Sequence, residues 1–169
     1  MKWWTALGVL LGLAVLYAMA LLGVSLTSRK KIVPPGEPLR FCGFYFDCHL
    51  SAAVTGFEVL PGPGGGLLYR VKITFANSAK KATLPLRKPR VEMIADDGTR
   101  IKPNATPPLL LLPPGGSLEV DFLFPSLKPQ VSPLLQVREG NPVARFTELF
   151  LIGDNDSFLH SPVLMAVRK

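Results

Sequence analysis

The sequence predicts an all-β protein: an immunoglobulin-like antiparallel β-sandwich of about seven strands, preceded by one N-terminal transmembrane helix. Three observations indicate this architecture. Residues 3–26 are apolar and uncharged, apolar and polar residues alternate further along the chain, and 17 Pro and 15 Gly residues punctuate the 169-residue sequence. We therefore divide the chain into an anchor (1–27), a Pro/Gly linker (28–39) and a sandwich domain (40–169). A small closed barrel is the alternative fold.

The N-terminal apolar segment, from Trp3 to Leu26, is long enough to cross a bilayer. As a helix rising about 1.5 Å per residue it would measure roughly 36 Å, against a hydrocarbon core of about 30 Å. Ala18-Met19-Ala20 resembles the cleavage site of a signal peptide, but the apolar residues continue beyond it. This length favours an uncleaved signal anchor, with a cleaved signal peptide as the alternative.

The side of the membrane on which the domain lies follows from two opposing signals. The basic residues 29–31 would hold the domain in the cytoplasm by the positive-inside rule, but long domains translocate largely regardless of charge. One apolar segment ahead of a turn-rich domain is the usual layout for export. We therefore expect an extracytoplasmic domain, periplasmic or extracellular, with the lipid bilayer contacted through residues 3–26. Gly8 and Gly12 form a GxxxG pair, which would allow a weak homodimer.

The alternation with a period of two predicts the individual strands. Residues 69–75 and 118–124 alternate most clearly between apolar and polar side chains, as expected for strands with one buried and one wet face. Weaker candidates are residues 55–60, 90–95 and 135–138, and the apolar run 148–152 is typical of a short buried strand. Pro- and Gly-rich turns separate these runs, and Asp97-Gly98 predicts a hairpin with a type I′ turn.

The residues at the ends of these strands form a recurring order. A strand ending in Phe75-Ala76-Asn77 leads into a turn, a later hairpin carries Asp96-Asp97-Gly98, and Pro114-Gly115 precedes a strand that ends in Phe122-Leu123-Phe124-Pro125. This order resembles the immunoglobulin-like domains of small membrane-anchored or exported bacterial proteins of uncharacterised function. The resemblance covers roughly residues 35 to 140. It implies the fold but no activity.

The two cysteines, Cys42 and Cys48, lie close together in the sequence. On a straight strand their Cα atoms would be about 20 Å apart, whereas bonded cysteines lie within about 7 Å, so pairing needs a chain reversal between them. In an oxidising compartment we expect a structural disulfide. The alternative is a zinc or copper site that uses Cys42, Cys48 and His49, with His160 as a fourth ligand. A redox-active pair and two unpaired thiols are weaker alternatives.

Positive charge gathers in the middle of the chain. The formal net charge is +7, and basic residues are densest between positions 80 and 102. The candidate basic surface consists of Lys80, Lys81, Arg87, Lys88 and Arg90. Because aromatic side chains do not alternate with these charges, we expect no nucleic-acid binding. We interpret these charges as a solvated surface that aids solubility, and a basic face that attracts anionic lipid headgroups or acidic polysaccharide is the alternative.

Motifs of catalysis are missing from the sequence, which contains no nucleophile elbow, HExxH motif or phosphate loop. The segment from Asp154 to Ser157 is rich in oxygen ligands but lacks the later residues of a calcium loop, so we interpret it as an acidic turn. We therefore expect a non-enzymatic, membrane-anchored module of the cell envelope that binds a protein partner and needs no cofactor. The alternative function is an envelope protein that handles zinc or copper through the cysteine and histidine residues.

Overall fold

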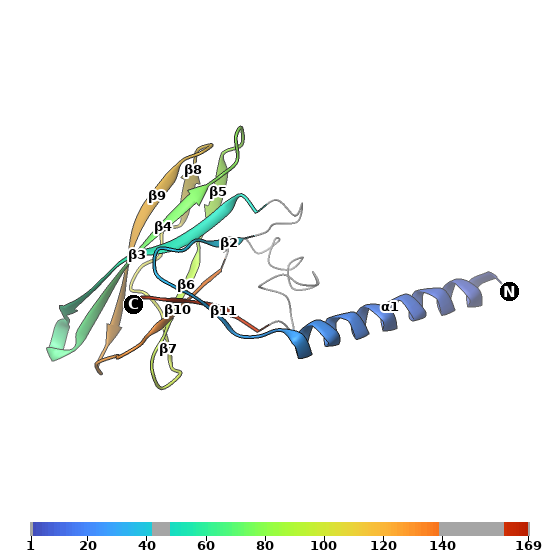
Figure 1. Ribbon diagram of the computed structural model, residues 1–169, viewed down its shortest axis with the longest axis horizontal. Helices are drawn as coiled ribbons and strands as arrows, with labels where there is room; N and C mark the ends of the chain where they lie inside the picture. The colour runs from blue at the N-terminus through green and yellow to red at the C-terminus, as the bar shows by residue number, and fades with distance from the viewer. Residues whose placement is uncertain (1, 42–47, 139–160, 169) are drawn as a thin grey trace.

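A computed structural model of the protein describes residues 2–41, 48–138 and 161–168 (Figure 1). One long helix, α1 (Lys2–Thr27), projects from a domain built of β-strands. The strands are β1 (Lys31–Val33), β2 (Leu39–Phe41), β3 (Leu50–Pro61), β4 (Leu67–Asn77), β5 (Leu84–Arg87), β6 (Arg90–Ile94), β7 (Arg100–Ile101), β8 (Leu109–Leu112), β9 (Ser117–Ser126), β10 (Leu134–Arg138) and β11 (Val163–Ala166), and the 3-10 turn η1 (Pro63–Gly65) joins β3 to β4.

The strands form two main sheets and a short ribbon. The five-stranded sheet has the order β1-β11-β10-β6-β7, the four-stranded sheet has the order β2-β3-β4-β9, and β5 pairs with β8. Among the described pairs, β1 and β11 run parallel and the others run antiparallel. The predicted fold class, a β-sandwich after one apolar helix, is confirmed. The described residues nevertheless form eleven strands rather than about seven, because several strands are too short for their alternation to be read.

The hydrophobic core lies between the two main sheets. Every second residue of β4 from Tyr69 to Phe75 is buried, as the alternation predicts. Phe75 packs edge-on against Phe122 of β9, with ring centroids 6.4 Å apart. The five-stranded sheet adds Met93 and Leu135 to the same cluster. Fully burying one such side chain stabilises the fold by about 1.5–3 kcal/mol.

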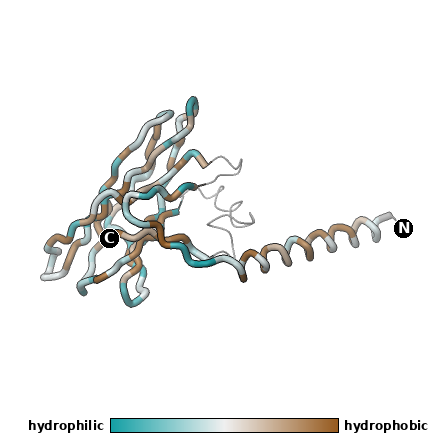
Figure 2. The backbone as a smooth tube through the Cα atoms, in the orientation of Figure 1, coloured by the Kyte–Doolittle hydropathy of each residue, from teal (hydrophilic) through white to brown (hydrophobic). Residues whose placement is uncertain are grey.

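Helix α1 continues almost directly into the sandwich. Its apolar span, Trp3–Thr27, is 25 residues long, which is sufficient to cross a membrane, although a signal sequence would have the same properties. Figure 2 shows that residues of apolar or neutral hydropathy run along the whole helix. Three residues separate α1 from β1, and the Ser28 hydroxyl accepts a hydrogen bond from the backbone N–H of Ser161, at 3.0 Å. The segment predicted as a linker thus contributes strand β1, with Val33 buried.

The predicted hairpin at Asp97-Gly98 joins β6 to β7, but its turn type differs from the prediction. The N–H of Gly98 donates to the carbonyl of Ala95, and the N–H of Ala95 donates to the carbonyl of Thr99. Gly98 has a φ of 84°, whereas Asp97 is not among the residues with positive φ. A type I′ turn needs positive φ at both central residues, so this loop is a longer turn that ends on a left-handed glycine.

Candidate functional site: a basic groove beside β6

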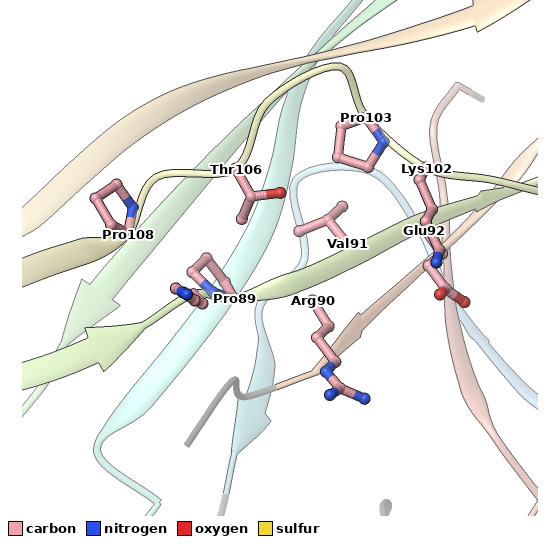
Figure 3. A pocket seen from close by; sticks show the side chains of 9 residues that line it. Pro89, Arg90, Val91, Glu92, Lys102, Pro103, Thr106 and Pro108 are labelled. Atoms are coloured by element: carbon pink, nitrogen blue, oxygen red, sulfur yellow. The ribbon is translucent and has the colours of Figure 1, made fainter. Parts of the chain in front are cut away.

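A groove with a volume of about 490 Å³ lies between β6 and the loop formed by residues 102–108. It is lined by Lys88, Pro89, Arg90, Val91, Glu92, Lys102, Pro103, Thr106 and Pro108. Figure 3 shows Pro103 and Thr106 on the loop across from Val91, and the side chain of Arg90 extending away from that loop. The volume falls within the range of about 300–1,000 Å³ that is typical of ligand pockets.

Local structure determines which side chains reach the groove. The burial pattern of β6 alternates, so Arg90 and Glu92 point away from the core. The loop 102–108 is held beside the start of β6 by a backbone hydrogen bond in which the N–H of Lys88 donates to the carbonyl of Pro108, at 3.1 Å. The residues that line the cavity therefore include cations from β6, from the turn before it and from the facing loop, with the Arg90 side chain extending away from that loop.

The charge of the groove is unbalanced. Glu92 is the one carboxylate among the lining residues, and it already forms an ion pair with Arg100, at 2.8 Å. Within the described part of the chain, Lys88, Arg90 and Lys102 take part in no ion pair. The groove therefore presents three uncompensated cations to an incoming ligand.

The outer face of the four-stranded sheet shows the opposite arrangement. Arg70 of β4 forms an ion pair with Glu58 of β3, and Lys72 of β4 forms one with Glu119 of β9, both at 3.2 Å. The hydrogen bond from Lys72 to Glu119 raises the pKa of the lysine. Because its cations are matched by carboxylates, this face offers an anionic ligand little net attraction.

The backbone of Lys88 is strained. Its φ is 41°, and it is the one non-glycine residue with positive φ in the described ranges. It also precedes Pro89, and a residue before proline favours extended conformations. Outliers of this kind cost on the order of 1–3 kcal/mol and cluster at functional sites. The strain therefore makes the groove a candidate functional site on grounds that are independent of its charge.

The structure divides the predicted basic surface into two parts. Lys88 and Arg90 line the groove, and Arg87 precedes them at the end of β5. Lys80 and Lys81 are exposed in the turn before β5, at the other end of that four-residue strand. The five residues therefore do not surround one cavity, and the groove residues are separable from the others by mutation.

Sequence reasoning did not assign Lys102, Pro103 or Thr106 to the candidate site. A signal for Lys102 was present, because it belongs to the same stretch of dense positive charge as Arg90. The Asp97-Gly98 hairpin reverses the chain and returns Lys102 to the side of β6. Combining the charge density with the predicted hairpin would have placed Lys102 beside Arg90.

The cysteine and histidine predictions fall mostly outside the described residues. Cys42, His160, the segment Asp154 to Ser157 and the predicted strand 148–152 all lie there. Cys48 is half-buried and is not a free cysteine, and His49 follows it just before β3. Among the residues that the structure does describe, no group of three or more His, Cys, Asp and Glu side chains is placed to hold a metal ion. The pairing of Cys42 with Cys48 and the alternative metal site stay predictions.

Comparison with known proteins places the chain by its fold. No protein-family model matches it, and no curated protein sequence does. MPT63, a secreted protein from Mycobacterium tuberculosis, aligns with a TM-score of 0.50 at 13% identity, covering 68% of this chain and 93% of that one. An uncharacterised β-sandwich protein from Clostridium difficile 630 aligns with a TM-score of 0.49 at 10% identity, covering 83% and 96% of the two chains.

The ycdA protein from Bacillus subtilis also aligns, with a TM-score of 0.43 at 14% identity. The alignment covers 62% of this chain but 34% of that one, so the present chain spans about a third of the length of ycdA. At these identities the likeness concerns the fold alone. The class of protein that the fold defines is therefore a β-sandwich protein with an N-terminal apolar helix.

Proposed function

We propose that this protein is a membrane-anchored module of the cell envelope whose extracytoplasmic β-sandwich binds a protein partner and catalyses no reaction. The observation that carries the proposal is the exposure of the apolar helix α1. None of the most apolar part of its span, Trp3–Thr27, is buried against the sandwich. Exposing so long an apolar helix to water is unfavourable, and a bilayer of about 30 Å removes this unfavourable contact.

The short connection between α1 and the sheet supports a domain that works close to the membrane. Residues 28–30 lead into β1, which pairs with β11 from Lys31 to Val33. Cys48 is not a free cysteine, and bonded cysteines are typical of oxidising compartments outside the cytoplasm. Both features favour an exported domain that stays attached to its anchor.

The composition of the groove supports a binding role. Two lysines, one arginine and three prolines are among its nine lining residues. Glu92, its one carboxylate, is held by Arg100. What the groove offers is positive charge and proline surface, which suit recognition of a partner.

Membrane attachment and sidedness are tested on the full chain with a C-terminal tag. We expect the protein to stay in the membrane pellet after alkaline carbonate extraction, at its full mass. We also expect protease to remove the tag from spheroplasts but not from sealed inverted vesicles. A soluble fragment that lacks residues 1–20, or protection of the tag in spheroplasts, would contradict the proposal.

A further inference from the structure

We infer that the groove between β6 and the loop 102–108 binds an extended acidic peptide segment of the partner protein. Arg90 would bind a carboxylate of this segment, and Lys88 and Lys102 would lie on either side of it. The inference rests on the proposed function for the partner being a protein. It adds the chemical class of the ligand and the residues that recognise it.

Arg90 has the geometry for a carboxylate. Its planar guanidinium can donate two parallel hydrogen bonds to one carboxylate group. Arg90 is exposed and forms no ion pair with any described residue, so its guanidinium is open to a ligand.

The walls of the groove favour a peptide over a sugar chain. The half-buried Pro103 and the exposed Pro108 present apolar rings, and these two residues and the buried Pro89 lack backbone N–H donors. The hydroxyl of Thr106 is the one hydroxyl group in the lining. A polysaccharide needs many hydrogen-bonding partners for its hydroxyl groups, whereas apolar side chains between acidic ones can pack on proline rings. We therefore expect the ligand to alternate acidic and apolar residues.

The strain at Lys88 fits this role. The backbone conformation of Lys88 is stabilised in part by its hydrogen bond to Pro108, which also sets the width of the groove. Together, the unmatched cations and the proline surface favour a ligand that is anionic and partly apolar.

The test uses the full-length protein in nanodiscs of zwitterionic lipid, so that anionic headgroups do not compete. The probe is a fluorescein-labelled octapeptide in which Glu alternates with Leu, and its binding is followed by fluorescence anisotropy. A matched peptide with Gln in place of Glu is expected to bind at least about tenfold more weakly, because it lacks the charge-assisted hydrogen bonds. Raising the ionic strength is expected to weaken binding of the Glu peptide, since salt screens exposed charges.

Two double variants with the same change in net charge separate the groove from the rest of the surface. Arg90→Glu with Lys102→Glu is expected to weaken binding of the Glu peptide by about tenfold or more. Lys80→Glu with Lys81→Glu, at the other end of β5, is expected to change it less than about twofold. Arg90→Gln with Lys102→Gln removes the charges without reversing them. It replaces the charge-reversal variant in the same binding assay if that variant fails to fold.

Four outcomes would overturn the inference. The first two are that the Glu peptide does not bind, or that both groove variants still bind it as the wild type does. The third is that the groove variants and the control variant lose binding of the Glu peptide equally. The fourth is that heparin binds more tightly than the Glu peptide and depends on Arg90 in the same way. The last result would assign the groove to an acidic polysaccharide. Failure of the carbonate or protease test would overturn the proposed location of the protein. Peptide binding that depends on Arg90 could still be observed in that case, so the two failures can be distinguished.

Discussion

The two ends of β5 are built in opposite ways. The turn before β5, residues 78–83, is organised by the buried Asn77 at the end of β4. The Nδ2 of Asn77 donates toward the carbonyls of Ala82, Leu112 and Pro113, at 2.8–3.1 Å, and its Oδ1 accepts from the N–H of Ala79, at 2.8 Å. Here one side chain satisfies several buried backbone groups from two separate turns.

The end of β5 that leads into the groove lacks such matching. Lys88 has a strained backbone, and the cations of the groove have no ion-pair partner among the described residues. The Asn77 end contributes to stability because its buried polar groups are paired. The groove end reduces stability, and we attribute its retention to binding. Substitutions in both regions test this difference.

The largest effect is expected at Asn77. Replacing it with alanine should lower the free energy of unfolding by about 3 kcal/mol, because buried carbonyl and N–H groups lose their partner. Urea unfolding of the full-length protein in detergent micelles, followed by the circular dichroism of the β-sheet, measures the change. The control is Asn104→Ala, since Asn104 is exposed and its side chain makes no described hydrogen bond. Equal destabilisation by both changes would remove the special role of Asn77.

A smaller loss is expected at Tyr69, where a second buried polar group is satisfied. Its hydroxyl accepts a hydrogen bond from the N–H of Gln130, at 2.8 Å, and its ring is buried. Tyr69→Phe keeps the ring and removes the hydroxyl, so we expect a loss of about 1–2 kcal/mol in the same assay. Tyr17→Phe in α1 is the control and should leave the sandwich unchanged. A neutral result at Tyr69 would mean that this part of the fold does not depend on the pairing of its polar groups.

At the groove end the expected sign is reversed. Lys88→Gly should raise the free energy of unfolding by about 0.5–1 kcal/mol, because glycine adopts positive φ without strain but loses more backbone entropy on folding. The same variant should bind the acidic peptide more weakly, since one cation is lost. Lys81→Gly, which has no positive φ to relieve, is the control and should not stabilise the protein. A less stable Lys88→Gly variant would show that the backbone of Lys88 is not strained.

The sequence allowed the long strands to be predicted but not the contacts that separate the two ends of β5. β4 was readable because buried and half-buried residues alternate along it. In β9 the same sequence alternation holds only near its end, where Phe122 and Phe124 are buried, whereas Leu118 is exposed although it was predicted to lie on the buried face. β1 and β5 were not readable, since three or four residues give no clear period and β1 pairs with a strand at the other end of the chain. The turn after Asn77 was recognised, but two of the three carbonyls that the side chain binds come from β8 and the turn after it.

The candidate site shows the same limit. Charge density identified Lys88 and Arg90, because the clustering of basic residues between positions 80 and 102 is visible in the sequence. The opposite wall, residues 102–108, is created by the return of the chain after the β6–β7 hairpin. The strain at Lys88 has no sequence signal either, since a lysine before proline predicts an extended backbone. Tertiary contacts therefore supplied the features that make the region a groove.

The smallest expected effect concerns the hairpin that places Lys102 beside β6. The carboxylate of Asp97 accepts a hydrogen bond from the N–H of Thr99, at 2.9 Å, and this bond holds the pKa of Asp97 below its usual value of 3.8. A group whose pKa is lowered by folding adds stability that is complete above the unfolded pKa. This stability is lost as the pH falls through the folded pKa.

The wild-type protein should therefore be more stable than Asp97→Asn near neutral pH, and the difference should shrink as the pH falls below 3.8. Asparagine can still accept the hydrogen bond from Thr99, so the variant isolates the contribution of the charge. Thermal unfolding of both proteins in the same detergent, at pH 6 and at pH 3, measures this change. Other carboxylates titrate in both proteins and cancel in the difference. A gap that widens on acidification would mean that the charge of Asp97 opposes the hairpin, and the wall of the groove would then be held by β7 and by the backbone hydrogen bonds of Lys88 to Pro108 and of Asn104 to Leu123.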